Sequence, residues 1–337
     1  MSIRMIAAMA VLALACTSLV VRAEEPTVLK FGFPGPPTTV FYTQNAVPWA
    51  KQVEEGSGGA VKIEFFVGGS VVNFRNVYDR VVNGVTEIGF GALQDVGSQF
   101  PKTEVGSLPF ETDHAVESSV AMWRLYAKGV IADEFARIKP LALHGFPLNG
   151  LHSVKPIAKV EDFRGAKTLV QTGMLGQAVT LYGATPLTLT VAEMYQALER
   201  GTANVIILGW SAISNYKMDE VVKYHLDVPL GSSIGYWFMN KDAFARLPEK
   251  ARTTIDNLSG EVLSKALGTS SDTNDHEVHA KVLAGAGQVL TKIDAQEVER
   301  WKRVLAPLTE QWVKSRSNGQ QVLDAFRAEV VRFKAGS

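Results

Sequence analysis

Residues 61–93, VKIEFFVGGSVVNFRNVYDRVVNGVTEIGFGAL, contain a complete strand–helix–strand unit. Apolar and charged residues alternate over 61–65, which is the period of a half-buried strand. Apolar residues then recur at helical spacing over 74–81, and Gly84 marks the end of that helix. A second strand-like run occupies 88–93. This order predicts parallel strands covered by helices.

The same alternation continues on both sides of this unit. We expect further strands at 28–33, 140–145, 166–170, 205–208, 224–229 and 236–240, and helices at 42–55, 117–128, 175–182 and 191–200. After Pro248 the pattern is nearly all helical. The sequence therefore predicts an α/β fold with two similar units and a helical tail. No low-complexity linker separates the units, so we expect a hinge between them rather than a flexible tether.

Composition excludes several classes of protein. The chain has 337 residues, of which 46% are hydrophobic and 20% charged, as in a globular protein of about two domains. Its 34 basic residues equal its 34 acidic residues, so no net charge attracts it to nucleic acid or anionic lipid. Cys16 is the single cysteine and there are 6 histidines. These counts exclude thiol enzymes and zinc–cysteine folds.

Residues 1–23 have the pattern of a secretory signal peptide. Arg4 precedes an apolar run over 5–15, and Val21-Arg22-Ala23 is a small-x-small cleavage pattern. One alternative is an N-terminal membrane anchor, which needs about 20 uninterrupted apolar residues. Another is a lipoprotein attached through Cys16, although the residues before this cysteine fit that motif poorly. We therefore expect an exported, soluble protein of the periplasm.

No group of residues has a convincing catalytic spacing. The run Gly231-Ser232-Ser233-Ile234-Gly235 matches the G-x-S-x-G motif of hydrolases, but a strand-like run follows where that motif needs a helix. His276 and His279 have helical spacing, with only acidic neighbours as further metal ligands, which favours a solvated polar face. The other histidines are isolated in the sequence. We predict that the protein is not an enzyme and uses no metal or cofactor, with a serine hydrolase using Ser233 as a remote alternative.

Several short segments occur in the order found in one protein family. They are GGS at 68–70, VVNGVTEIG at 81–89, LPF at 108–110, DFRGAK at 162–167, GATP at 183–186, EMYQALERG at 193–201 and EVVKY at 220–224. Together they resemble the substrate-binding proteins of tripartite ATP-independent periplasmic (TRAP) transporters, the C4-dicarboxylate-binding-protein-like family. The resemblance extends from Leu29 to about Gly319.

The resemblance implies a two-lobed periplasmic binding protein with a hinge, crossing strands and a long helix that spans both lobes. We assign residues 24–147 and about 232–270 to lobe I, and residues 148–231 and about 271–330 to lobe II. It also implies one small ligand in the interlobe cleft and delivery of that ligand to the membrane subunits of a TRAP transporter. The alternative function is a ligand-presenting sensor subunit for a membrane signalling protein. We expect a monomer that binds no nucleic acid.

Two positions depart from the family pattern. Most members have an arginine on the strand after the D-x-x-G-x-K segment, and its guanidinium pairs with a ligand carboxylate. Here Thr168 or Leu169 stands in that place, depending on a one-residue gap. Leu208 replaces an asparagine that helps to hold the ligand. Burying a carboxylate beside these leucines without a cation would cost several kcal/mol.

We therefore expect a ligand whose recognised end is neutral, or an acid held by a different residue. Trp210 and Tyr236 would stack on a planar ligand, and amide side chains would hydrogen-bond to it. The predicted ligand-binding residues are Phe33, Gln94, Asn149, Thr168, Leu169, Gln171, Leu208, Trp210 and Tyr236. Lys155, Lys167 and Lys217 are the candidate replacement cations.

Overall fold

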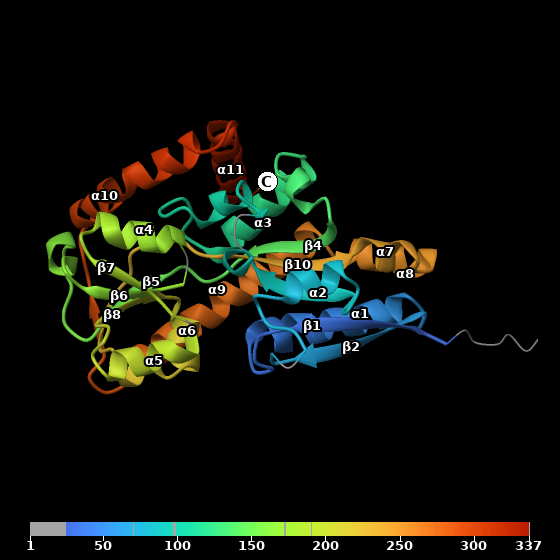
Figure 1. Cartoon of the computed structure of the whole chain (residues 1–337), viewed down its shortest axis with the longest axis horizontal. Coiled ribbons are helices and arrows are strands. Elements are labelled where there is room, and N and C mark those ends of the chain that lie inside the picture. Colours follow the sequence, from blue (N-terminus) through green and yellow to red (C-terminus); the bar gives the residue numbers. More distant parts are fainter. Residues whose placement is uncertain (1–24, 70, 97–98, 172, 190, 337) are drawn as a thin grey trace, which may run out of the picture.

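Two sheets, each covered by helices, form the two lobes of the protein (Figure 1). This computed structural model describes residues 25–336 except 70, 97–98, 172 and 190. The predicted signal peptide lies outside these residues. Within the described part of the chain, no helix is both long and apolar enough to cross a membrane.

The predicted strands and helices occur in the predicted order, with further elements between them. The strands are β1 (Thr27–Phe33), β2 (Val61–Val67), β3 (Ile88–Ala92), β4 (Ile138–Gly145), β5 (Gly150–Ser153), β6 (Lys167–Val170), β7 (Thr185–Thr188), β8 (Val205–Leu208), β9 (Tyr224–Leu226), β10 (Ile234–Asn240) and β11 (Val289–Thr291). The α-helices are α1 (Val47–Gly56), α2 (Val77–Val82), α3 (Ala115–Ala127), α4 (Gly173–Leu181), α5 (Val191–Glu199), α6 (Trp210–Asn215), α7 (Lys241–Ala245), α8 (Glu249–Asn257), α9 (Glu261–Leu283), α10 (Ala295–Lys314) and α11 (Gly319–Lys334).

Lobe I is built on a five-stranded sheet with the order β2-β1-β3-β10-β4. Strands β1 and β2 pair in parallel from Thr27 opposite Val61 to Phe33 opposite Val67. In β2 the burial alternates along the first four residues, as the charge pattern predicts. The helix expected over 42–55 is divided, because a π-helical segment, η1 (Phe41–Ala46), precedes α1.

Lobe II is built on a six-stranded sheet with the order β11-β9-β5-β8-β6-β7. Three of its strands were not predicted. β5 is fully buried although it contains a histidine and a serine, so it lacks the apolar run that marks a central strand. β7 is an edge strand that contains Pro186, and β11 has only three residues within the helical tail. The strand predicted over 224–229 ends earlier, at Leu226.

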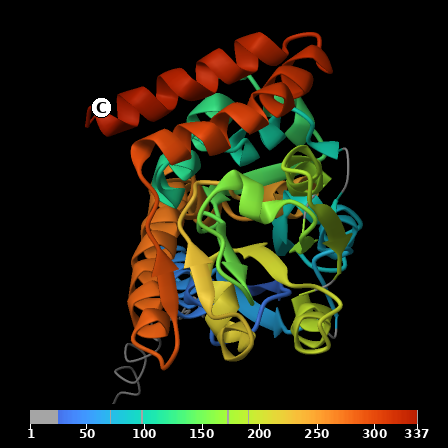
Figure 2. The ribbon, with the colours of Figure 1, turned by 90° about the vertical axis from the view of Figure 1, so that its left-hand side faces the viewer.

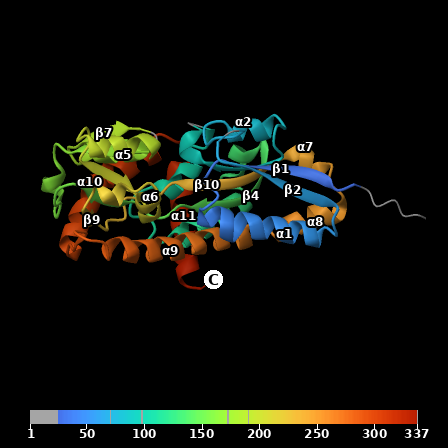
Figure 3. The same cartoon turned by 90° about the horizontal axis from the view of Figure 1, so that it is seen from below.

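Three connections join the lobes. Segment 146–149 leads from β4 to β5, and segment 227–233 leads from β9 back to β10. The third is α9, a 23-residue helix that runs along one side of the molecule past both sheets (Figure 3). α9 contacts β4 and α3 of lobe I and α6 of lobe II. Its length is about 35 Å, at 1.5 Å per residue.

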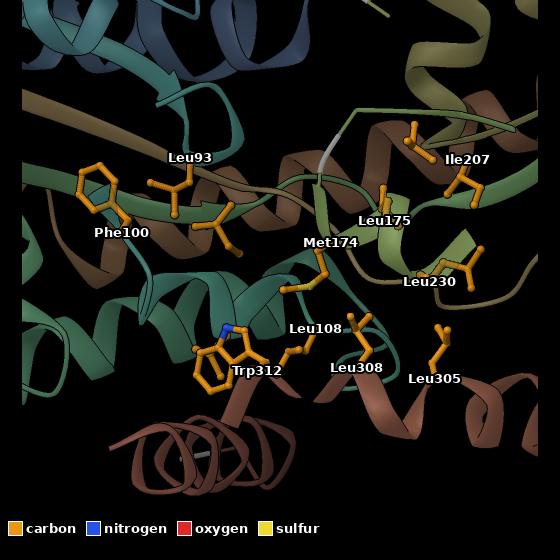
Figure 4. Close-up of a cluster of buried hydrophobic side chains, with 14 of the residues drawn as sticks. Leu93, Phe100, Leu108, Met174, Leu175, Ile207, Leu230, Leu305, Leu308 and Trp312 are labelled. Atoms are coloured by element: carbon orange, nitrogen blue, oxygen red, sulfur yellow. The ribbon is translucent and has the colours of Figure 1, made fainter. Parts of the chain in front are cut away.

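One buried apolar cluster continues from lobe I into lobe II. It includes Leu93 and Leu108 of lobe I, Leu230 of the crossing segment, and Met174 and Leu175 of α4 (Figure 4). These side chains are nearly inaccessible to water. The two lobes therefore share dry apolar packing on the α4 side of their boundary.

The helical tail packs across both lobes. α10 contacts α4 of lobe II, and α11 contacts α3 of lobe I. The two tail helices lie together along one long side of the molecule (Figure 1 and Figure 2). Asp294 caps α10 through a hydrogen bond from the Glu297 backbone N–H to its Oδ1 at 2.8 Å.

Candidate functional site

Strand directions place a candidate site at the boundary between the lobes. β4 ends at this boundary, and β1 and β3 run in the same direction as β4 because β10 is antiparallel to both β3 and β4. β5 begins at the boundary, and β8 is antiparallel to β5, so β8 ends there together with β6 and β7. The carboxyl ends of the parallel strands of both sheets therefore meet. Ligands of open α/β sheets bind at such ends.

Aromatic side chains gather at the lobe I side of this boundary. Phe33, at the end of β1, is fully buried and stacks on Phe90 with ring centroids 4.9 Å apart. Phe41 contacts Phe146 of the crossing segment at 5.4 Å and His144 at 4.9 Å. Burial lowers the pKa of His144 to about 4, so this ring is neutral near pH 7. The lobe I side of the boundary is thus aromatic and uncharged at these residues.

The lobe II side of the boundary is apolar at the positions to which the resemblance assigns the family's polar anchors. Leu169 and Leu208 are buried in one cluster, together with Met194 and Ile213. Thr168 is also fully buried, and its hydroxyl has no hydrogen-bond partner among the described residues. These positions stay predicted ligand contacts. Their surroundings suit an apolar group better than a carboxylate.

Polar residues predicted to contact the ligand occupy different environments. Asn149 lies in the first crossing segment, where its Nδ2 and its backbone N–H both donate to the carbonyl of Gly231 in the other crossing segment, each at 3.0 Å. Gln171 is partly buried at the end of β6. The side chain of Gln94 lies outside the described part of the structure. Asn149 thus holds the two crossing segments together.

Tyr236 lies within the core of lobe I. Its ring stacks on Phe238, with centroids 4.5 Å apart, and tilts against Phe100 at 5.4 Å. Burial raises the pKa of Tyr236 well above 10, and its hydroxyl has no partner among the residues that the structure describes. The geometry brings Tyr236 next to other core aromatics rather than next to Trp210.

Trp210 begins α6 and is enclosed by three imidazole rings. Its ring centroid lies 4.7 Å from that of His152, 4.7 Å from that of His225 and 4.4 Å from that of His279. Its Nε1 donates to Oδ1 of Asp227 at 3.1 Å. Sequence reasoning identified Trp210 but treated these histidines as isolated or as part of a solvated face. Only strand and helix pairing brings them together.

Helix α9 supplies carboxylates to the N-termini of two other helices. Asp272 accepts hydrogen bonds from the backbone N–H groups of Ala115 and Val116, at the start of α3 in lobe I. Asp275 accepts from the backbone N–H and the hydroxyl of Ser211, at the start of α6 in lobe II. Each carboxylate satisfies orphan donors in a helix first turn. One turn of α9 is therefore bonded to both lobes.

Replacing Asp275 by asparagine should flatten the pH dependence of stability. Burial raises the pKa of Asp275 from 3.8 to about 6. The folded state therefore keeps this proton to higher pH than the unfolded state, and stability falls as pH rises from about 4 to about 6. The expected contribution is about 3 kcal/mol. Urea unfolding of wild type and D275N at several pH values measures it. Exposed Asp324→Asn should follow wild type, and parallel curves for wild type and D275N would contradict the assignment.

The three candidate replacement cations lie at exposed positions. Lys155, Lys167 and Lys217 are all exposed to solvent.

The hydrolase motif lies in a connection between strands. The segment 231–235 belongs to the crossing connection and enters strand β10, so Ser233 is not on the strand-to-helix turn that a hydrolase nucleophile needs. The structure therefore gives Ser233 no nucleophile geometry.

Curated relatives match most of the chain. A protein of Comamonas testosteroni named outer membrane transporter protein TsaT is 28% identical over 295 residues, 84% of this chain and 85% of that protein. The C4-dicarboxylate-binding periplasmic protein DctP of Rhodobacter capsulatus is 26% identical over 296 residues, 84% of this chain and 86% of that protein.

Solved structures agree over nearly the whole fold. A TRAP solute-binding protein from Rhodoferax ferrireducens, in complex with copurified benzoate, has a TM-score of 0.86 and 26% identity, over 92% of this chain and 100% of that one. A TRAP periplasmic solute-binding protein from Bordetella bronchiseptica with bound (R)- and (S)-mandelate has a TM-score of 0.83 and 27% identity, over 91% and 100%.

The family comparison covers both lobes and the region between them. Residues 35–315 match the family described as bacterial extracellular solute-binding protein, family 7. The order of short motifs, the two-lobed α/β fold and the solved TRAP relatives lead to the same assignment. The chain belongs to the family 7 bacterial extracellular solute-binding proteins, the family of TRAP transporter substrate-binding proteins that its sequence resembles.

Proposed function

We propose that the protein is an extracytoplasmic solute receptor that binds a small aromatic ligand between its lobes and delivers it to the membrane subunits of a TRAP transporter. Lobe I comprises residues 24–147 and about 232–270, and lobe II residues 148–231 and about 271–330. The site lacks the usual carboxylate-binding arginine. The ligand is therefore held by apolar contact and by polar groups other than that guanidinium.

The observation that carries this proposal is the shared cluster of Leu169 and Leu208. The resemblance places Leu208 where the family has its asparagine, and Leu169 or Thr168, depending on a one-residue gap, where the family has its arginine. Leu169 and Leu208 are both buried among apolar side chains, near the ends of β6 and β8. Phe33 and Phe90, which stack on each other at the lobe I side of the boundary, support a planar ligand. A small flexible dicarboxylate would need a cation that neither side of the boundary provides at these residues.

The relatives with bound ligands support the same chemical class. The Rhodoferax ferrireducens protein binds benzoate and the Bordetella bronchiseptica protein binds mandelate. Both ligands carry one aromatic ring and one carboxylate. Aromatic monoacids and their neutral amides are therefore the first compounds to test.

A thermal-shift screen of the purified protein tests the proposal. Benzoate, mandelate, benzamide and succinate are compared at matched concentrations. A ligand that binds only the folded state stabilises it by about 2.7 kcal/mol at 100 times its Kd. This corresponds to a rise of about 5 °C in Tm for a chain of this size. We expect aromatic compounds to raise Tm and succinate to leave it unchanged.

The lysine variants serve as matched controls. K155A, K167A and K217A should retain the aromatic shift, because all three side chains are exposed. Loss of acid binding in one variant would identify that lysine as the carboxylate anchor. A shift with succinate and none with aromatic compounds would contradict the proposed ligand class.

A further inference from the structure

His152 and His225 lie directly opposite each other in the antiparallel pair formed by β5 and β9. Their Nδ1 atoms are 2.7 Å apart, which is a hydrogen-bond distance. β5 follows the first crossing segment at once, and β9 immediately precedes the second. The pair therefore joins the two strands through which the chain enters and leaves lobe II.

Each outer ring nitrogen of this pair faces an acceptor. His152 Nε2 lies 3.0 Å from the carbonyl oxygen of Leu208, and His225 Nε2 lies 2.7 Å from Oε1 of Gln288. The amide of Gln288 is held in this orientation because its Nε2 donates to the carbonyl of Asp219 at 2.8 Å. Neither oxygen can donate a proton. Both imidazoles must therefore carry a hydrogen on Nε2.

Counting the available N–H groups then leaves the contact between the two Nδ1 atoms without a donor. Two neutral imidazoles carry one N–H each, and the outer contacts use both. Without a further proton the two Nδ1 lone pairs would face each other at 2.7 Å, where they repel. We infer that His152 and His225 bind one additional proton, shared between their Nδ1 atoms, and that this singly charged pair clamps the two crossing strands together.

Charged groups around the pair are compatible with one positive charge. Asp219 and Asp227 face His225 and favour its charged form, whereas His279 of α9 opposes it. The side chain of Lys223 donates to the carbonyl of Asp219. On α9, Asp275 lies one turn before His279 and is bonded to Ser211 rather than to the pair.

The pair does not take up a second proton near neutral pH. Burial, together with the charge of His225, lowers the pKa of His152 to about 3. Burial also lowers the pKa of His225, although Gln288, Asp227 and Asp219 favour its charged form. Burial therefore opposes even the single charge of the pair, and the shared hydrogen bond between the Nδ1 atoms has to outweigh it. Coupled rings release their protons in two steps that belong to the pair, and a doubly charged pair is the unfavourable state here.

The shared proton makes the hinge sensitive to pH. Under this inference the hydrogen bond between the two Nδ1 atoms outweighs burial, so the folded pair binds its proton more tightly than free imidazoles with a pKa of about 6.5. Its contribution to stability is thus complete below about pH 6.5 and is lost as pH rises through the pair's own higher pKa. Loss of the proton places two lone pairs between β5 and β9 and loosens the crossing strands. The consequence for ligand affinity rests on the proposed function, whereas the proton count does not.

Nitrogen NMR of the purified, ligand-free protein with ¹⁵N-labelled histidine tests the proton directly. We expect both Nε2 atoms to be protonated and one proton to bridge the two Nδ1 atoms at pH 7. Two neutral rings without a bridging proton would overturn the inference whatever the protein binds.

The variant H225N distinguishes the effect of the shared proton from general effects on stability. An asparagine amide can donate to His152 Nδ1 without an additional proton, so this variant should fold and lose the change in urea midpoint that wild type shows above pH 6.5. H276N replaces an exposed histidine of α9 and should retain the wild-type profile. Equal profiles in wild type and H225N would overturn the inference.

The pH dependence of benzoate affinity tests whether the shared proton affects ligand binding. For wild type and H276N we expect binding at least threefold weaker at pH 9 than at pH 7, and no such change for H225N. Benzoate affinity that is independent of pH in wild type would contradict the role at the hinge even if NMR shows the proton. If no aromatic compound binds at any pH, the proposed function fails while the NMR result still decides the proton count.

Discussion

Replacing Gly231 by alanine is expected to lower the free energy of unfolding by about 3–5 kcal/mol. Gly231 has φ of +83°, a conformation that costs energy for residues with a Cβ. A Cβ at this position would lie 2.4 Å from the backbone carbonyl oxygen of Ser107. Because that atom belongs to the main chain, the overlap is relieved only by moving the crossing segment. Urea unfolding of wild type and G231A measures the loss.

Substitution of Gly129 distinguishes the cost of backbone strain from the cost of steric overlap. Gly129 has φ of +81°, and no described atom lies within 4 Å of its Cβ position. G129A should therefore show only the backbone cost, about 1–2 kcal/mol. Equal losses in G129A and G231A would show that the contact with Ser107 does not restrict this segment.

The second large effect is expected for Trp210→Ala. The ring is nearly fully buried and contacts His152, His225 and His279. Its removal should cost about 3–5 kcal/mol, the usual range for a large buried aromatic residue. It also removes the side chain that covers the imidazole pair. We expect a lower urea midpoint and loss of the Tm shift produced by benzoate.

Trp210→Phe is the matched control. It keeps an aromatic ring in contact with the imidazoles and loses the hydrogen bond from Nε1 to Asp227. The expected loss is about 1 kcal/mol, with benzoate binding retained. If W210F is as damaging as W210A, the hydrogen bond rather than the ring packing determines the effect. If W210A retains the benzoate shift, Trp210 is not required for the site.

Fold class was predictable from sequence because long segments have one clear period. The alternation in β2 and the helical spacing of α3 both depend on neighbours within a few residues. β5 was not predictable, because its four buried residues include His152 and Ser153 and have no apolar alternation. A short central strand of this kind is recognised only through the strands that pair with it.

The candidate site was predictable in part. Resemblance to the family predicts departures at Leu208 and at Thr168 or Leu169, and the structure places Leu169 and Leu208 in one apolar cluster. The imidazole pair left no local signal, because His152 and His225 are 73 positions apart and meet only through strand register. Residues whose role depends on such register need a three-dimensional arrangement before their chemistry can be assessed.

We expect the positions of Asp272 and Asp275 to determine how far each part of the molecule moves if the lobes rotate about α9. The two residues are separated by three positions on α9, about 4.5 Å along its axis. One is bonded to the start of α3 and the other to the start of α6. Residues near such a short pivot move little during a rotation. The distant sheet edges, at β2 and β7, move most. Single-molecule distance labels placed near those edge strands should therefore report opening with far greater sensitivity than labels near α9.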